Sequence, residues 1–384
     1  MDKVCDNKNS LNFPLRTLPK KSNQFLRLNT ICPYYTMFPL DFPFKVLRRA
    51  DSKEKVLDPF CGRGTSNFAA RLRGMESVGI DTNPVACAIA SAKLVHTTPE
   101  KIIELCKVIL ESKKEPEDIP AGEFWNLCYH PSTLHQICKL REYFLEKCEN
   151  AEDVALRSII LGIMHGPRNE KTVSYLSNQM PRTYASKPNY SVKFWKKNEL
   201  KPQKINVLDV ICRRAKYSFS YLPPSTGGGI LKADCSNPIK NSLVDEFNWV
   251  ITSPPYYQMK TYVQDQWLRN WFLGGSPEVD YSTKGQLSHS SQEAFVKELG
   301  KVWKNVADVC APEVKLVIRF GALPSSPVNP TELLKTSLEK SNCGWKVSTI
   351  KYAGSAAKGK RQADQFSKNV GEAQKEIDLY AVLR

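Results

Sequence analysis

Four consecutive residues, Ser253-Pro254-Pro255-Tyr256, combine groups that suit one kind of chemistry. They follow an apolar run, residues 250–252, that has the character of a sheet strand. Two prolines have fixed φ and no N–H donors, so the chain leaves the strand in a rigid, extended shape. The Ser253 hydroxyl and the Pro254 carbonyl can accept from an exocyclic amine, and the Tyr256 ring can stack on the flat ring that carries it. Taken alone, the tetrapeptide is equally compatible with a polyproline-type surface loop.

A second stretch has the layout of a nucleoside-binding unit. An apolar strand, Val56-Leu57, leads into the glycine turn Asp58-Pro59-Phe60-Cys61-Gly62-Arg63-Gly64-Thr65, and a helix over residues 66–73 follows. Residues 77–81 form a second short strand that ends in an acid, Asp81. Glycines let the backbone approach a ligand closely, and Asp81 is placed to accept from ribose hydroxyls.

Together the two stretches resemble the amino-group DNA methyltransferases. Residues 58–65 are similar to the S-adenosylmethionine loop of that family, and residues 253–256 are similar to its catalytic loop. Serine at the head of the catalytic loop resembles the cytosine-N4 branch, because adenine-N6 enzymes more often carry Asp or Asn there. The strand and helix pattern extends the resemblance over roughly residues 30–95 and 228–384.

The resemblance implies an α/β fold of the Rossmann-like, class I methyltransferase type, with a seven-stranded, mostly parallel sheet, one antiparallel strand, and a helical and irregular insertion. It implies S-adenosyl-L-methionine as cofactor without a metal, double-stranded DNA as partner, and a functional link to a cognate restriction endonuclease. The catalytic residues that it implies are Ser253, Pro254, Pro255 and Tyr256. The cofactor-binding residues that it implies are Asp58, Pro59, Phe60, Gly62, Gly64, Thr65, Asp81 and Asp234, the last accepting from the adenine amino group.

Composition narrows the class of protein further. The 384 residues are 41% hydrophobic, which is ample for one large or two modest domains. The sequence shows neither an apolar run of membrane-spanning length nor a signal-peptide pattern, so we expect a cytoplasmic protein without membrane contact. Its 12 cysteines include no Cys-x-x-Cys pair, which disfavours a zinc site or a disulfide framework. A net charge of +16 indicates a polyanionic partner.

The pattern divides the chain into four parts. We predict a basic arm over residues 1–30, the cofactor-binding part of a catalytic domain over 31–96, an insertion over 97–220, and the catalytic part over 221–384. The insertion is expected to be mostly helical and then irregular. Its end, residues 181–220, holds ten Lys or Arg and two acids, interleaved with aromatic residues. Basic residues with aromatics favour contact with phosphates and bases, so this region is the predicted DNA contact.

Other functions remain open from the sequence alone. One is an adenine-N6 DNA methyltransferase, and another is an RNA guanine-N2 methyltransferase, whose members also carry Asp-Pro-Phe-Cys-Gly-x-Gly loops. A third is a DNA-binding protein on a degenerate methyltransferase scaffold, which the intact Asp58, Asp81 and Ser253 disfavour.

Overall fold

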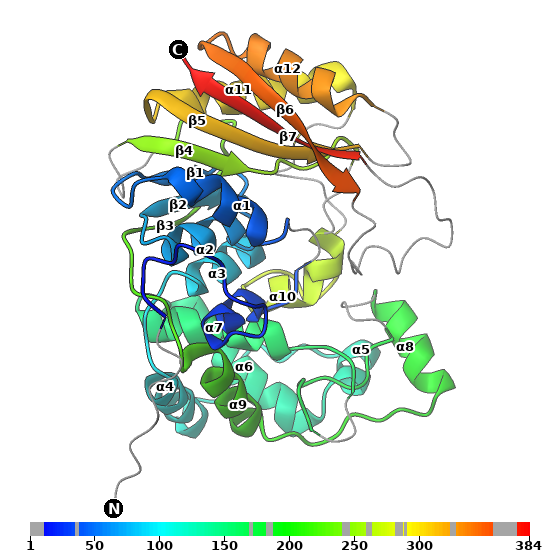
Figure 1. Ribbon diagram of the computed structural model, residues 1–384. Helices are drawn as coiled ribbons and strands as arrows, with labels where there is room; N and C mark the ends of the chain where they lie inside the picture. Colours follow the sequence, from blue (N-terminus) through cyan, green and yellow to red (C-terminus); the bar gives the residue numbers. More distant parts are fainter. Residues whose placement is uncertain are drawn as a thin grey trace, which may run out of the picture.

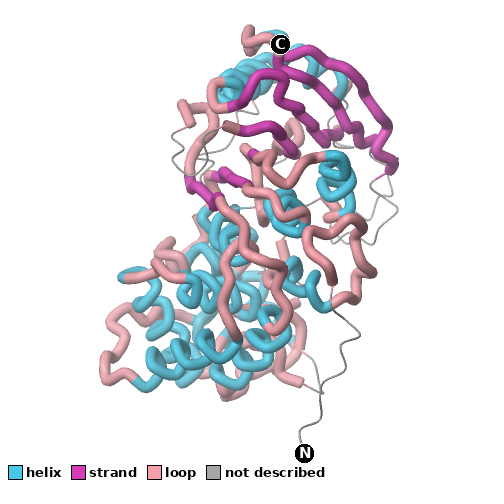
Figure 2. The backbone as a smooth tube through the Cα atoms, turned by 60° about the vertical axis from the view of Figure 1, so that its left-hand side comes forward, coloured by secondary structure: helices cyan, strands magenta, loops and turns pink. Residues whose placement is uncertain are grey.

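The structure is a computed structural model that describes residues 11–34, 38–168, 172–181, 187–239, 246–258, 263–280, 287, 290–322, 328–355 and 375–384. A strand-rich part and a helix-rich part lie at opposite ends of the molecule (Figures 1 and 2). No helix in these described ranges is both long and apolar enough to cross a membrane.

The sheet has seven strands in the order β3-β2-β1-β4-β5-β7-β6. The strands are β1 (Val56–Asp58), β2 (Ser77–Asp81), β3 (Gly228–Lys232), β4 (Phe247–Thr252), β5 (Cys310–Gly321), β6 (Trp345–Ser355) and β7 (Lys375–Leu383). Strand β7 runs antiparallel to both of its neighbours, and the pairs from β3 to β5 are parallel. The predicted fold class is therefore confirmed, including the single antiparallel strand near the edge.

Helices cover both faces of the sheet, because successive side chains of a strand point to opposite faces. Leu57, Val250 and Leu316 share a core with α11 (Gln292–Ala307) and α12 (Pro330–Lys340). On the other face, Val56 and Ile251 pack with α1 (Asp41–Val46) and α2 (Thr65–Leu72). The short 3-10 helix η2 (Leu47–Arg49) extends α1.

The insertion does not form a core of its own. Its helices are α4 (Pro99–Glu111), α5 (Glu123–Cys128), α6 (Pro131–Glu146), α7 (Ala151–Ile163), α8 (Pro188–Lys197) and α9 (Val207–Phe219). Their buried apolar residues share one cluster with α2, with α3 (Pro84–Ala92) and with α10 (Trp267–Phe272), which follows η3 (Val263–Gln266). The end of the insertion is more helical than the sequence predicts, because α8 and α9 occupy most of residues 188–219.

One buried arginine fastens both ends of the insertion to α2. The Arg71 guanidinium donates from Nη1 to the carbonyls of Lys93 (2.7 Å) and Val95 (3.0 Å), just before the insertion begins. It also donates from Nη2 to Pro223 O (2.8 Å) and from Nε to Pro224 O (3.0 Å), just after the insertion ends. Arg71 is fully buried. The insertion is thus tied to the helix that follows the glycine loop.

Residues 11–34, most of which the sequence assigns to a basic arm, pack along the helical part. Leu15, Leu26 and Leu28 are buried in the same cluster as the insertion helices, and η1 (Gln24–Thr30) lies against α9. Leu15 N donates to Leu72 O at 2.9 Å, so this segment also reaches the end of α2.

Candidate active site

The sequence motifs meet at one edge of the sheet. Strands β1, β2, β3 and β4 are parallel neighbours, so the loops that follow them leave the sheet at the same edge. That edge is where open α/β sheets bind their ligands. Strand β1 precedes the glycine loop, and its hydrogen-bonded neighbour β4 precedes Ser253.

The two glycines of the loop have different roles. Both adopt positive φ, +49° at Gly62 and +70° at Gly64, a conformation that favours glycine. A Cβ on Gly64 would lie 2.8 Å from the Ala90 Cβ, so this glycine allows α3 to pack against the loop. A Cβ on Gly62 would meet nothing within 4 Å. Open space on the Cβ side is present at Gly62, and the role of both glycines beside a ligand stays a prediction.

Asp81 ties the glycine loop to the end of β2. Its Oδ2 accepts from Gly62 N at 2.9 Å, and its Oδ1 accepts from Asn83 N at 2.8 Å. Burial raises the pKa of the Asp81 carboxyl, and the backbone donors oppose that rise. The Asn83 side chain in turn donates to Tyr34 OH at 3.1 Å, which brings the segment before α1 over this end of the sheet. Asp81 thus shapes the loop as well as offering a carboxylate.

Asp58 lies at the end of β1 and is completely buried. Its Oδ1 accepts from Phe60 N at 3.2 Å. Burial raises its pKa to about 6, while the hydroxyls of Thr252 and Ser66 act in the opposite direction. Ser66 also donates to Ile251 O at 3.1 Å. These contacts join the start of α2 to the end of β4, directly before the Ser-Pro-Pro-Tyr loop.

The remaining cofactor residues predicted from the sequence lie in the glycine loop or in the turn after β3. Pro59 O accepts from the Cys235 thiol at 3.2 Å, which holds the turn after β3 against the loop after β1. Phe60 makes an edge contact with the Trp303 ring, and Thr65 is buried. Asp234 lies in the turn after β3, is exposed, and accepts from Ser236 N at 2.8 Å.

The Ser-Pro-Pro-Tyr loop follows β4, as predicted. Ser253 and Pro255 are partly buried and Pro254 is buried. Tyr256 is only 9% exposed; its ring lies edge-on to Phe320, with centroids 5.2 Å apart. Its hydroxyl donates to Glu376 Oε1 on β7 at 2.8 Å, an interaction for which the motif carries no signal. The structure therefore anchors Tyr256 against β7, and its stacking role stays a prediction.

Sequence reasoning also missed a group of buried cations beside the glycine loop. Arg63, between the two glycines, is 4% exposed, and Lys93 is 0% exposed. An arginine in a glycine-rich loop is ordinarily a surface residue. The local sequence carries no sign of this burial; Cys32, far upstream, lies near enough for the charges of Arg63 and Lys93 to act on the pKa of its thiol.

At the basic end of the insertion most charged side chains are exposed, whereas the aromatic side chains are partly exposed and partly buried. Tyr190 and Tyr217 are 50% and 45% exposed, whereas Trp195 and Phe219 belong to the core. Tyr184 lies outside the described residues. The exposed basic residues of α8, α9 and the stretches beside them are Lys187, Lys193, Lys196, Lys197, Lys201, Lys204, Arg213 and Lys216. This surface keeps the predicted charge but only part of the predicted aromatic surface.

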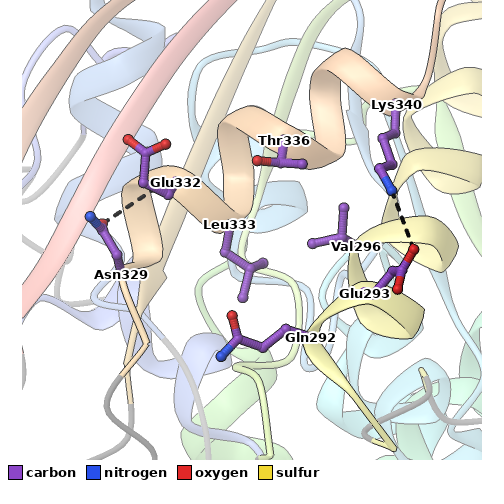
Figure 3. Close-up of a pocket in the computed structure, with 8 residues that line it drawn as sticks. All are labelled: Gln292, Glu293, Val296, Asn329, Glu332, Leu333, Thr336 and Lys340. Atoms are coloured by element: carbon purple, nitrogen blue, oxygen red, sulfur yellow. Dashed lines mark hydrogen bonds and ion pairs between the residues drawn. The ribbon is translucent and has the colours of Figure 1, made fainter.

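A groove between α11 and α12 is lined by Gln292, Glu293, Val296, Asn329, Glu332, Leu333, Thr336 and Lys340, none of them a predicted site residue (Figure 3). Lys340 Nζ and Glu293 Oε1 lie 3.9 Å apart across it. Asn329 Oδ1 accepts from the N–H groups of Thr331 and Glu332, which caps α12. These polar side chains pair the two helices with each other or cap α12.

Comparison with known proteins gives structural likenesses only. No family model matches the chain, and no curated protein matches it. The rRNA methyltransferase aviRa from Streptomyces viridochromogenes is 11% identical with a TM-score of 0.33, over 91% of this chain and 87% of that one. A TehB-like SAM-dependent methyltransferase from Corynebacterium glutamicum is 8% identical with a TM-score of 0.33, over 91% and 89%.

Magnesium protoporphyrin IX methyltransferase from Synechocystis PCC 6803, solved with bound SAM, is 8% identical with a TM-score of 0.34, over 95% of this chain and 93% of that one. The strand order and pairing directions of the sheet, rather than these likenesses, define the fold.

Proposed function

We propose that this protein is an S-adenosylmethionine-dependent methyltransferase that methylates the exocyclic N4 of cytosine in double-stranded DNA. One observation carries the proposal: the glycine loop and the Ser-Pro-Pro-Tyr loop follow β1 and β4, which are adjacent parallel strands paired through Val56↔Trp249 and Leu57↔Val250. A methyl donor held by the first loop and an amine held by the second would meet at this edge.

The residues present fit the cofactor. The space beside Gly62 admits a ligand against the backbone, and the Asp81 carboxylate lies at the end of the neighbouring strand. Asp234, one strand further, is exposed and follows β3, whose Lys232 pairs with Asp81. The cofactor supplies, when bound, a methyl group activated by its sulfonium. The polar groups of β2 and β3 would receive the ribose and the adenine.

The catalytic loop would hold the amine. The lone pair of an exocyclic amine is delocalised into its ring, and acceptors that bind the two N–H groups favour the geometry for attack. The Ser253 hydroxyl and the Pro254 carbonyl supply such acceptors on a backbone that two prolines make rigid. The base must leave the duplex, at a cost of a few kcal/mol. Stacking on Tyr256 would return about 1–3 kcal/mol of this cost.

The basic surface of α8 and α9 supports a nucleic acid as the partner. Its eight exposed basic residues include lysines on two successive turns of α8, Lys193 and Lys197. Phosphate contacts by such residues bind a duplex without reading its sequence. Together with the choice of cytosine, this makes host protection beside a restriction endonuclease the biological role that we propose.

The test is methylation by the purified full chain with isotope-labelled S-adenosylmethionine, offered separately genomic DNA, single-stranded DNA and total RNA. Mass spectrometry of the digested nucleosides should show labelled N4-methylcytosine from double-stranded DNA. Labelled N6-methyladenine would overturn the base assignment and keep the chemistry. Label only in RNA would favour the guanine-N2 alternative, and DNA binding without any transfer would favour the non-enzymatic one.

Three variants test the roles of Ser253 and Tyr256 in the Ser-Pro-Pro-Tyr loop. Ser253→Ala should lower turnover and keep DNA binding, because the hydroxyl aligns the amine. Tyr256→Phe keeps the ring and removes the hydroxyl bond to Glu376, whereas Tyr256→Ala removes both. If the ring is what binds the base, the Ala variant should lose far more turnover than the Phe variant, with cofactor affinity unchanged in both.

A further inference from the structure

A group of buried basic side chains surrounds the start of the segment Cys32–Tyr34. Lys93 is 0% exposed, Arg269 1% and Arg63 4%. Burial raises the pKa of the Cys32 thiol, and the charges of Arg269, Arg63, Arg214 and Lys93 oppose that rise, so these cations lie near it. Burial also lowers the pKa of Lys93, with the charge of Arg63 as the next cause. We call Arg63, Lys93 and Arg269 the buried cationic cluster.

The members of the buried cationic cluster differ in how well they are paired. Arg269 donates from Nε to Leu161 O (2.8 Å) and from Nη1 to Pro33 O (3.1 Å), and only its Nη2 has no hydrogen-bond partner among the described residues. Lys93 Nζ donates to Asn29 Oδ1 at 2.8 Å. In contrast, Arg63 Nε and Nη2 have no hydrogen-bond partner among the described residues. No described acid forms an ion pair with Arg63 or Lys93 either.

Arg319 shows what the Nε and Nη2 side of a guanidinium binds in this protein. Arg319 donates from Nε and Nη2 to the two carboxylate oxygens of Asp378, each at 2.8 Å. This side-on, two-bond pairing is the strong form of arginine–carboxylate recognition. Arg63 leaves the equivalent pair of donors unpartnered in a buried place, where an unpaired guanidinium is strongly unfavourable. An anionic group with two oxygens matches it.

The position of Arg63 identifies the anion. Arg63 follows Gly62, whose N–H binds the Asp81 carboxylate. The segment Cys32–Tyr34 joins the two places: Tyr34 OH accepts from Asn83, beside Asp81, and the Cys32 thiol lies among the cations. A ligand with a nucleoside at one end and a carboxylate at the other would span them, with the ribose at Asp81 and the acid at Arg63.

We propose that Arg63 forms a two-bond contact with the methionine carboxylate of S-adenosylmethionine. This assignment rests on the cofactor named in the proposed function. It makes Arg63 a ligand-binding residue that selects nucleosides with an amino-acid tail.

The test compares two ligands on the full chain by calorimetry: S-adenosylmethionine and decarboxylated S-adenosylmethionine, which lacks only this carboxylate. The unmodified protein should prefer the first by about 10- to 100-fold, the range of a charge-assisted pair. Arg63→Met should remove the preference by weakening only the carboxylated ligand. Arg63→Lys should keep a small part of it.

The matched control is Lys232→Met, which removes an exposed cation from the strand position paired with Asp81. It should leave the preference intact, because its charge does not contact the carboxylate. Thermal unfolding of each unliganded variant reports whether folding is preserved. Arg63→Met should unfold at no lower temperature than the unmodified protein, since it removes a buried unpaired charge.

Two results would overturn the assignment while leaving the proposed function in place: a preference that survives Arg63→Met, or equal weakening of both ligands. Failure of the unmodified protein to bind either nucleoside would remove the cofactor assignment together with this proposal. Methylation of DNA, measured separately, tells these cases apart.

Discussion

Arg63 and Arg71 lie at the two ends of α2, one just before its first residue and one in its last turn. Both are almost completely buried, and burial lowers the pKa of each to about 10. Arg71 directs its guanidinium at four backbone carbonyls, from Lys93, Val95, Pro223 and Pro224. Arg63 leaves two of its guanidinium nitrogens without a partner in the described chain.

The contrast separates two uses of a buried charge. When the protein itself supplies all the acceptors, the charge serves the fold, and here it joins the insertion to α2, the helix that follows the glycine loop. When acceptors are missing, the desolvation cost stays uncompensated until a ligand arrives.

The largest expected effect is on folding, at Arg71. Arg71→Met would remove the donor from four backbone carbonyls, and the loss at the two buried bonds, to Lys93 and Pro223, costs about 1–3 kcal/mol each before relaxation. We expect urea denaturation to show a loss of at least about 3 kcal/mol in unfolding free energy. Arg63→Met, the matched variant at the other end of α2, should show no loss. Equal losses in both would erase the distinction between the two arginines.

The next effect concerns Asp58 and pH. Its pKa is raised to about 6 in the folded protein from the ordinary 3.8, so the fold binds this proton more tightly than the unfolded chain does. The resulting stability is present below pH about 4 and is lost as the pH rises through about 6. The loss is on the order of 3 kcal/mol. In Asp58→Asn, denaturation curves across this range should have a flatter pH dependence; an unchanged slope would assign the titration to other groups.

The motif residues could be predicted because their placement is local. The end of β1 is marked by a glycine turn, the end of β2 by an acid, and the end of β4 by two prolines. Each signal can be recognised without knowing the rest of the structure. Arg63 and Glu376 could not be predicted in this way. Arg63 lies near Cys32, which is distant in the sequence, and the bond from Tyr256 to Glu376 joins residues 120 positions apart.

The helices at the end of the insertion did have a sequence signal. Val207, Val210, Ile211, Ala215 and Phe219 recur at helical spacing, and all are buried in α9. The density of basic residues between them makes the stretch look irregular, although the charges occupy the other face of the helix.

Asp81 tests whether one carboxylate can serve the fold and a ligand together. Its two oxygens accept from Gly62 N and Asn83 N, and spare lone pairs remain for ribose hydroxyls. Asp81→Ala should weaken S-adenosylmethionine binding by roughly 1–3 kcal/mol in calorimetry. Asp234→Ala, which removes an exposed carboxylate, should cost less. Unchanged affinity in Asp81→Ala would remove Asp81 from the cofactor site.

The smallest effect per residue is expected on the basic surface, where charge is already solvated. Replacing Lys193, Lys196 and Lys197 together by Gln should weaken binding to duplex DNA and lower the salt slope by roughly 0.9 for each phosphate that is no longer neutralised. Lys196 also pairs with Glu123, so its own replacement should change the slope least. Fluorescence anisotropy over a salt series measures both quantities.

The control for this surface is the triple Gln variant of Lys297, Lys301 and Lys304, three exposed lysines that share one face of α11. It removes the same charge from a helix on the sheet part of the molecule. If general electrostatic attraction held the DNA, both triple variants would bind DNA more weakly to the same degree, since a change of three charges acts at long range on either surface. A larger loss of affinity in the α8 variant alone places the contact on the insertion, because only direct phosphate neutralisation releases counterions and changes the slope.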